Sequence, residues 1–188
     1  MLSVLRLVQS LRFALRDMQG VKVSDFELIE SINQAASLLY IQMSEKYVRY
    51  GMKKNSAFNV PSSGYANLPT DFIKIHQVGM GTDGVAVPTS YLATTQGTYR
   101  IIGDTFYAPS GVYGLEYYYV PVRVNSLNDD LDVPEAMSPY IEQIALAIYG
   151  NNLEKATQIV STCVVSLSDR EVSHFDNVGP VQVLGGRV

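Results

Sequence analysis

Apolar residues recur at helical spacing through the first eighteen residues of the chain. They lie three or four positions apart and so share one helical face: Val4, Val8, Leu11, Leu15 and Met18. Arginines interrupt the run, and its length and charge exclude a membrane span. An amphipathic, arginine-bearing and acid-poor start also resembles a mitochondrial transit segment. We favour a helix docked on the fold, because only a short connection separates it from a second helix.

The second helix has a well-defined start at residues 24–27, SDFE. This is a capping box, in which the Ser24 side chain accepts from the Glu27 amide and the Glu27 side chain accepts from the Ser24 amide. Apolar residues then keep three-four spacing, and we expect the helix to reach Tyr50 before Gly51 ends it. At about 39 Å it needs partners along most of its length. Helices at both ends of the chain are available, which predicts an antiparallel bundle of three to four helices.

From Met52 onward the pattern changes from helix to strand. We interpret residues 53–56 as a polar link and residues 61–64, PSSG, as a turn. Short runs rich in β-branched and aromatic residues predict five strands: Phe72–Val78, Val85–Val87, Tyr99–Ile102, Thr105–Tyr107 and Leu115–Val120. Residues 103–104, GD, are the expected hairpin turn. The strands predict a small, largely antiparallel sheet or partial barrel.

The last of these strands carries three consecutive tyrosines. Tyr117 and Tyr119 share one face with Leu115, whereas Tyr118 lies on the opposite face. We expect one face to pack on the helices or the sheet interior. The other face would leave a tyrosine at the surface or at a contact with a neighbouring subunit.

Helices resume after an acidic loop. Pro134 suits the first turn of a helix, and Asp132 is placed to cap it. Residues 150–152, GNN, mark a break before a last helix that we expect from Leu153 to about Ser173. The chain therefore returns to helical sequence after its β region.

The order of these elements predicts an α+β fold. Residues 1–52 and 134–173 would form the helical bundle, residues 53–133 an inserted small antiparallel β region, and residues 174–188 an extended C-terminal tail. The tail carries the candidate partner-binding residues: Val178, Val181, Val183 and Leu184. It would dock as an added strand or a groove peptide, or stay disordered in the free subunit.

Composition narrows the functional classes. The 188 residues are 47% hydrophobic and 17% charged, which indicates one ordered domain whose surface is partly covered by partners. The net charge of −4 disfavours tight DNA binding, which usually rests on clustered lysine and arginine. Tyrosine outnumbers phenylalanine by 13 to 6, a bias common at subunit contacts.

Residues with catalytic or metal-binding chemistry are few. His76 and His174 are the only histidines, and we expect both to be surface or packing residues. Together with one cysteine they do not supply a zinc site of usual spacing. Cys163 lies in apolar helical sequence and is expected to be a core thiol in a reducing compartment. A hydrolase with a carboxylate or Ser-His site assembled in space stays an alternative.

The acidic loop has part of a calcium-binding pattern. Asn128, Asp130 and Asp132 alternate as calcium ligands do, but Val133 and Pro139 occupy the positions that need glycine and glutamate. We interpret the loop as a solvated turn that favours the N-terminus of the next helix. We therefore expect no catalytic residue, no metal and no cofactor.

Four segments carry a resemblance across roughly residues 20–155. They are the capped second helix with INQA at 32–35, LPTDF at 68–72, YRIIG at 99–103, and the tyrosine strand with its acidic loop and following helix. Together they resemble the head-to-tail adaptor (connector) proteins of tailed bacteriophages, of the tail tubular A type.

The resemblance implies a structural virion protein rather than an enzyme. Members of that family form a twelve-subunit ring beneath the portal protein, with helices around the channel, and hold the tail nozzle or tail tube protein below. DNA would pass through the channel without sequence-specific binding. The implied location is the head-tail interface of the virion, assembled in the host cytoplasm, with no membrane contact. The alternative is a small helical protein-binding module with a β insertion, organellar if the first helix is a transit segment.

Overall fold

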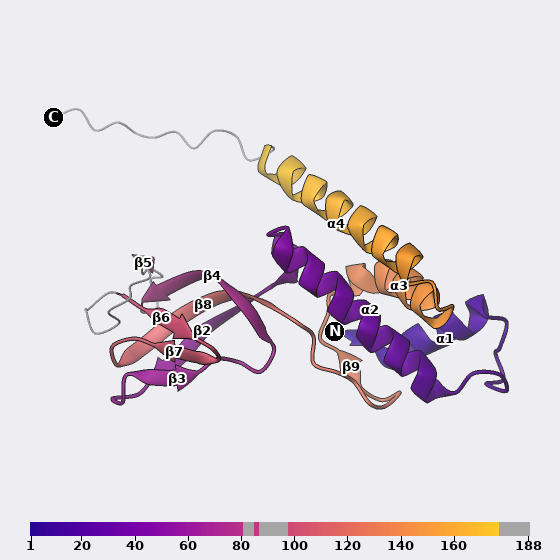
Figure 1. Cartoon of the computed structure of the whole chain (residues 1–188), viewed down its shortest axis with the longest axis horizontal. Helices are drawn as coiled ribbons and strands as arrows, with labels where there is room; N and C mark the ends of the chain where they lie inside the picture. Colours follow the sequence, from indigo (N-terminus) through magenta and orange to yellow (C-terminus); the bar gives the residue numbers. More distant parts are fainter. Residues whose placement is uncertain (81–84, 87–97, 177–188) are drawn as a thin grey trace.

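The computed structural model describes residues 1–80, 85–86 and 98–176. In these residues, four α-helices gather at one end of an elongated molecule and most of the strands form its other end (Figure 1). This confirms the α+β class with antiparallel pairing. The described residues hold nine strands in three sheets rather than five in one. The β region is therefore substantial, and a helical bundle with only a small β insertion is not confirmed.

The N-terminal segment is docked, as expected. A two-residue strand, β1 (Leu2–Ser3), pairs antiparallel with β9 (Asp130–Leu131), and α1 (Val4–Ala14) follows. The face that α1 buries belongs to the main core: Val4, Leu7, Val8 and Leu11. The prediction that Met18 belongs to this face is wrong, because the helix ends before Met18 and its side chain is exposed.

Three helices end in the same backbone motif. These are α1, α2 (Asp25–Glu45) and α3 (Ser138–Tyr149). After each one, a residue other than glycine has a positive φ: Arg16 at 54°, Tyr47 at 59° and Asn151 at 54°. The N–H of that residue and the next N–H bond back to carbonyls of the last turn, which is a Schellman motif. A side chain at this position costs about 1 kcal/mol relative to glycine.

The second helix starts as predicted and ends earlier. The Glu27 N–H donates to Ser24 Oγ at 3.3 Å, and the Ser24 N–H donates to Glu27 Oε2 at 2.9 Å. The helix ends at Glu45 rather than Tyr50, so it is about 32 Å long. The turn at Tyr47 stops it, because the next N–H already bonds to the Met43 carbonyl. The predicted terminator lies later, in the 3-10 turn η1 (Arg49–Gly51).

The third helix begins later than predicted. Pro134 precedes a 3-10 turn, η2 (Glu135–Met137), and Pro139 instead occupies the first turn of α3. The predicted cap by Asp132 is wrong, because its carboxylate forms an ion pair with Lys53. The break at residues 150–152 is confirmed.

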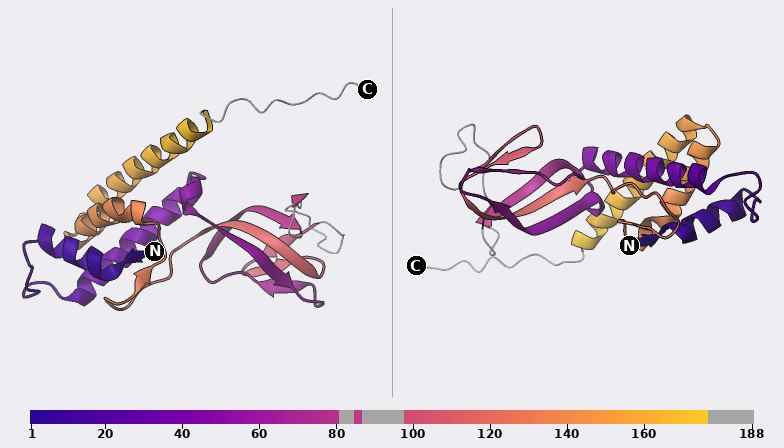
Figure 2. Two further views of the ribbon diagram at one scale, coloured as in Figure 1. Left: turned by 180° about the vertical axis from the view of Figure 1, so that it is seen from behind. Right: turned by 90° about the horizontal axis from the view of Figure 1, so that it is seen from below.

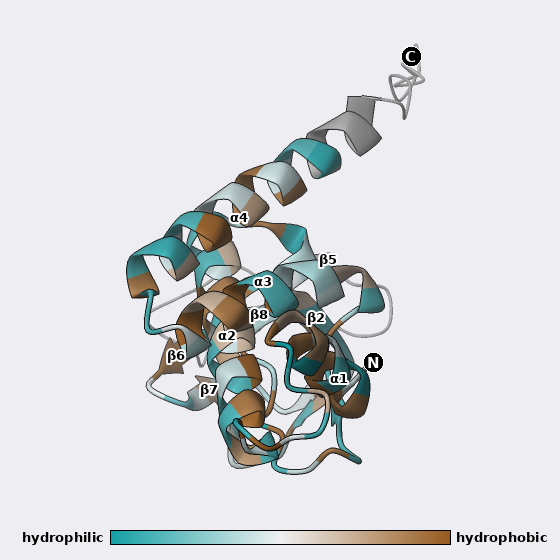
Figure 3. Cartoon of the chain, turned by 90° about the vertical axis from the view of Figure 1, so that its right-hand side faces the viewer, coloured by the Kyte–Doolittle hydropathy of each residue, from teal (hydrophilic) through white to brown (hydrophobic). Residues whose placement is uncertain are grey.

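The four helices share one core. The last helix, α4 (Leu153–Asp176), contacts α3 and α2, and α1 contacts α2 and α3. Apolar side chains of all four helices join the same buried cluster. Figure 3 shows polar and apolar residues alternating along α4, which projects beyond the rest of the fold. None of the helices in the described part has the length and apolar character to cross a membrane.

The larger sheet has the strand order β2 (Met52–Val60), β8 (Gly111–Tyr119), β4 (Phe72–Met80), β5 (Val85–Ala86). The polar link expected at residues 53–56 is wrong, because all four residues belong to β2. Met52 pairs with Tyr118 and Asn55 with Leu115. An edge strand with a solvated face accepts polar residues, so its sequence lacks an apolar alternation.

The smaller sheet has the order β3 (Tyr65–Asn67), β7 (Thr105–Tyr107), β6 (Arg100–Ile102). The predicted turn between β6 and β7 is confirmed, with Gly103 at φ 56°. Aromatic rings form the core beside this sheet. Phe106 stacks on Tyr99 at 5.3 Å and meets Phe58 and Tyr113 edge-on at 5.4 and 5.5 Å between ring centroids.

The tyrosine strand is buried on both faces. Tyr117 and Tyr119 are buried as predicted. The expectation that the second face leaves a tyrosine at the surface is wrong, because Tyr118 is fully buried. Tyr47 covers it edge-on at 6.3 Å between ring centroids, and the Lys74 Nζ lies 5.2 Å from its ring centroid. Sequence alternation gives the face of a side chain but not what covers that face.

Two crossings of the chain join the helices to the sheets (Figure 2). The first leads from α2 through η1 into β2, and the second leads from β8 through residues 120–129 to β9 beside α1. These crossings set where the helices lie relative to the sheets. The side chains at these crossings therefore hold the helical part and the sheets together.

Candidate functional site

The residues singled out for catalysis are not gathered into a site. His76 is exposed on β4, with its ring edge-on to Tyr118. His174 belongs to α4, but its side chain lies outside the described residues. Cys163 is buried on α4, and burial raises the pKa of its thiol, which confirms the predicted core thiol. In the described part of the chain, no group of three or more metal-ligating side chains converges.

The acidic residues of the loop have separate protein partners, through the carboxylates of Asp129 and Asp132 and through the backbone of Asp130. Asp129 accepts hydrogen bonds from the N–H groups of Asn125 and Ser126 at 2.8 and 3.0 Å. Asp130 pairs with Ser3 in the β1-β9 sheet. Asp132 binds Lys53. The acidic loop is therefore fixed by contacts with its own backbone, and it fixes the second crossing to β1 and Lys53.

Lys53 is the centre of a charged cluster between the helices and the larger sheet. Its Nζ lies 2.7 Å from Asp71 Oδ2, in the turn before β4, and also contacts Asp132 Oδ2, after β9. Only 27% of the Lys53 side chain is exposed. One cation thus joins β2, the turn before β4 and the segment that follows β9.

Tyrosines enclose this cation. The Lys53 Nζ lies 4.1 Å from the ring centroid of Tyr119, whose hydroxyl donates to the Asp132 carbonyl at 2.9 Å. Tyr40 of α2 meets the Tyr119 ring edge-on at 4.9 Å. The Tyr117 hydroxyl donates to Asp71 Oδ1 at 3.3 Å. We call these residues the junction cluster: Tyr40, Lys53, Asp71, Tyr117, Tyr119 and Asp132.

Lys53 and Tyr117, two members of the junction cluster, have raised pKa values. Burial opposes the charge of Lys53, but the hydrogen bonds to Asp132 and Asp71 outweigh it and raise the pKa of Lys53. Burial and the negative charge of Asp71 raise the pKa of Tyr117 to about 12. The cluster joins three segments through ion pairs and hydrogen bonds, so it acts as a brace.

Asn33 holds the second crossing onto α2. Its Nδ2 donates to the Val124 carbonyl at 2.9 Å, and its Oδ1 accepts from the Val124 N–H at 3.0 Å. The side chain is buried, with only 3% of the residue exposed. A single amide therefore satisfies both backbone groups of a residue that has no strand partner here.

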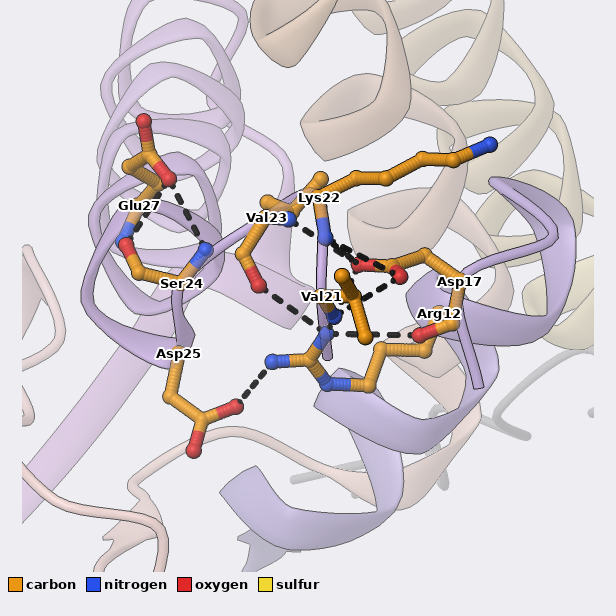
Figure 4. A network of polar contacts seen from close by, with 8 residues as sticks. All are labelled: Arg12, Asp17, Val21, Lys22, Val23, Ser24, Asp25 and Glu27. Atoms are coloured by element: carbon orange, nitrogen blue, oxygen red, sulfur yellow. Dashed lines mark hydrogen bonds and ion pairs between the residues drawn. The ribbon is translucent and has the colours of Figure 1, made fainter. Parts of the chain in front are cut away.

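The connection between α1 and α2 is fixed by a second polar network (Figure 4). Asp17 is buried and accepts from the N–H groups of Val21, Lys22 and Val23. Arg12 binds Asp17, the Val23 carbonyl and Asp25. Polar contacts thus hold this connection, while three large apolar side chains in or beside it are exposed: Phe13 at 76%, Met18 at 64% and Val21 at 79%.

The Asp17 network predicts an acid-sensitive fold. Burial opposes ionisation, but the three backbone donors and Arg12 lower the pKa of Asp17 below its ordinary value of 3.8. A lowered folded pKa stabilises the fold above the ordinary value, and this contribution is lost as pH falls through the folded value. Urea midpoints measured from about pH 5 to pH 2 should therefore fall steeply for the natural chain and less for Asp17→Asn. Glu154→Gln, at an exposed carboxylate, should retain the steep fall; equal slopes for all three proteins would contradict the assignment.

Exposed apolar side chains also mark the opposite end of the molecule. Tyr65 on β3, Ile102 on β6 and Val112 on β8 are 51%, 55% and 46% exposed. The α1-α2 connection and these strands lie at the two ends of the long axis (Figure 1). Apolar side chains are exposed between the two ends as well, for example Ile41 and Val122. Apolar surfaces mark contacts with other proteins where the exposed side chains are contiguous.

The sequence predicted some of these positions and missed others. The predicted partner-binding residues Val178, Val181, Val183 and Leu184 lie outside the described residues. Lys53 belongs to the predicted polar link, and Asn33 has no predicted role in holding a crossing. Neither has a local signal, because their partners are 18 or more positions away in the sequence.

The chain matches none of the protein-family models with which it was compared, and no curated protein matches it significantly.

Proposed function

We propose that this chain is the repeating subunit of a ring that joins the portal of a tailed bacteriophage to its tail and continues the DNA channel. Twelve copies would form the ring, with portal protein above and the tail nozzle or tail tube protein below. In the virion it would act as a structural protein at the head-tail interface. The proposal combines the resemblance of residues 20–155 with the distribution of exposed apolar side chains.

The observation that carries the proposal is the exposure of large apolar side chains at both ends of a braced, elongated chain. Phe13, Met18 and Val21 lie at the helical end, and Tyr65 and Ile102 lie at the sheet end. A subunit that connects two assemblies needs a contact surface at each end. It also needs a central part that keeps the two ends in a fixed relative position, and the junction cluster would supply it.

In the proposed ring, the helices would pack as an antiparallel bundle around the channel. A closed ring uses heterologous contacts, in which one face of a subunit meets a different face of the next. The low charged fraction of 17% suits a chain with much surface in such contacts. The tail residues Val178, Val181, Val183 and Leu184 remain candidates for docking on the portal or on a neighbouring subunit.

The organellar binding module is less compatible with the fold. A transit segment would be removed, yet the apolar face of α1 is part of the same core as the other helices. Removing α1 would take four buried side chains out of this core. The adaptor proposal requires no such loss.

The assembly state tests the proposal. The chain should be mixed with the portal protein of the same virus and examined by native mass spectrometry and negative-stain microscopy, which should show a twelve-fold ring on the portal. Val21→Glu should abolish or weaken this complex, because it places a charge in an exposed apolar surface. Gln19→Glu adds the same charge to an exposed polar position of the same connection and should leave the complex intact. A chain that stays monomeric and unbound beside its portal would refute the adaptor.

A further inference from the structure

Cationic and aromatic side chains gather where α2 passes into the larger sheet. Four of the 14 lysines and arginines of the chain lie in residues 46–54, and no acidic residue lies between Glu45 and Asp71. Lys74 of β4 adds a cation beside this segment, because its Nζ lies 3.6 Å from the ring centroid of Tyr47. This concentration occurs in a chain whose net charge is −4.

The sheet divides the two consecutive lysines of β2 between its faces. Lys53 points to the junction cluster, whereas Lys54 is 68% exposed and contacts Glu116 at 3.4 Å. Lys54 therefore lies on the side of the sheet where Tyr47 covers Tyr118. We define the Tyr47 surface as Lys46, Tyr47, Arg49, Tyr50, Lys54 and Lys74.

The two tyrosines of this surface are exposed residues. Tyr47 is 66% exposed and Tyr50 is 42% exposed. Tyr47 occupies the positive-φ position that ends α2, where glycine would be less strained. Its ring is held by Lys74 and Tyr118, so one ring face is fixed and much of the side chain stays accessible.

We infer that the Tyr47 surface binds nucleic acid, with its lysines and arginine on the phosphates and the tyrosine rings stacked on unpaired bases. Single-stranded nucleic acid is the form that this chemistry favours, because stacking needs an unpaired base while the cations follow the backbone. The overall negative charge keeps such binding weak and salt-sensitive. The inference goes beyond the adaptor proposal and does not depend on ring formation.

Fluorescence anisotropy with the full chain and a labelled oligothymidine of about 16 nucleotides tests this inference. We expect binding at low salt, with a slope of log affinity against log salt of about −2 if three phosphates are contacted. Tyr47→Gly removes the ring at a position that suits glycine, and should weaken binding about tenfold. Tyr47→Phe retains the ring and should bind like the natural chain.

Charge variants test whether the lysines of the Tyr47 surface, rather than lysines elsewhere in the protein, contact the phosphates. Lys46→Gln should reduce the salt slope by about 0.7, the share of one phosphate contact. Lys155→Gln removes an exposed lysine at the start of α4 and should change nothing.

Four results would overturn the inference. These are no binding at low salt, equal binding by Tyr47→Gly and the natural chain, and duplex DNA bound as tightly as the single strand. The fourth is binding of labelled polyglutamate in place of the oligonucleotide, which would identify the surface as a site for an acidic protein.

Discussion

Replacing Asn33 with alanine is expected to lower the free energy of unfolding by about 2–4 kcal/mol. The change leaves the N–H and the carbonyl of Val124 buried without their partner, and each unsatisfied group costs about 1–3 kcal/mol. It also leaves a small cavity. The higher helix propensity of alanine returns only a few tenths of a kcal/mol. Urea unfolding monitored by circular dichroism should show a lower midpoint with an unchanged slope.

The adjacent residue provides the control for Asn33. Gln34 is exposed on the same helix, so Gln34→Ala should change stability by no more than about 0.5 kcal/mol. If both variants unfold at the same urea concentration, the amide does not hold the crossing. A loss of the size expected would be a large fraction of the roughly 5–15 kcal/mol that stabilises a domain.

Replacing Lys53 with methionine is expected to cost about 2–3 kcal/mol. The methionine fills similar volume but leaves Asp71 and Asp132 without their shared cation in a partly buried setting. The penalty is smaller than for a fully buried pair, because water reaches part of the Lys53 side chain. Lys54→Met is the matched control, since its ion pair with Glu116 is largely exposed and should contribute less than about 0.5 kcal/mol.

A double variant distinguishes lost pairing from lost packing at Lys53. Asp132→Asn removes one of the two carboxylates, so it should cost less in the Lys53→Met background than in the natural chain. Strictly additive costs would mean that the brace does not depend on the ion pair. In the proposed ring, Lys53→Met should also loosen the sheets relative to the helices, which faster hydrogen exchange in β2 and residues 120–129 would report.

Both variants address how the two parts of the molecule are held together. Asn33 fixes the returning crossing to α2, and Lys53 fixes β2 to the turn before β4 and to the returning chain. In the proposed ring, such contacts would keep the helical part and the sheets in a fixed arrangement when force is applied at one end.

Local sequence determined the elements whose cause is local. The capping box at Ser24 fixes the start of α2, and the spacing of Val4, Val8 and Leu11 fixes the buried face of α1. Gly103 fixes the hairpin between β6 and β7. Each of these features depends on side chains and backbone groups within about one or two turns, so a single sequence suffices to predict them.

Tertiary structure decided the features that depend on distant partners. The polar strand β2 exists because it pairs with β8, and Tyr118 is buried because Tyr47 and Lys74 arrive from other elements. Asp132 is drawn from a helix cap to Lys53, 79 positions away in the sequence. The sequence by itself thus determined the α+β class, the starts of α2 and α4, and most strands. Only the fold decided which polar and aromatic side chains meet, because an ion pair or a ring contact requires a proximity that the order of residues does not encode.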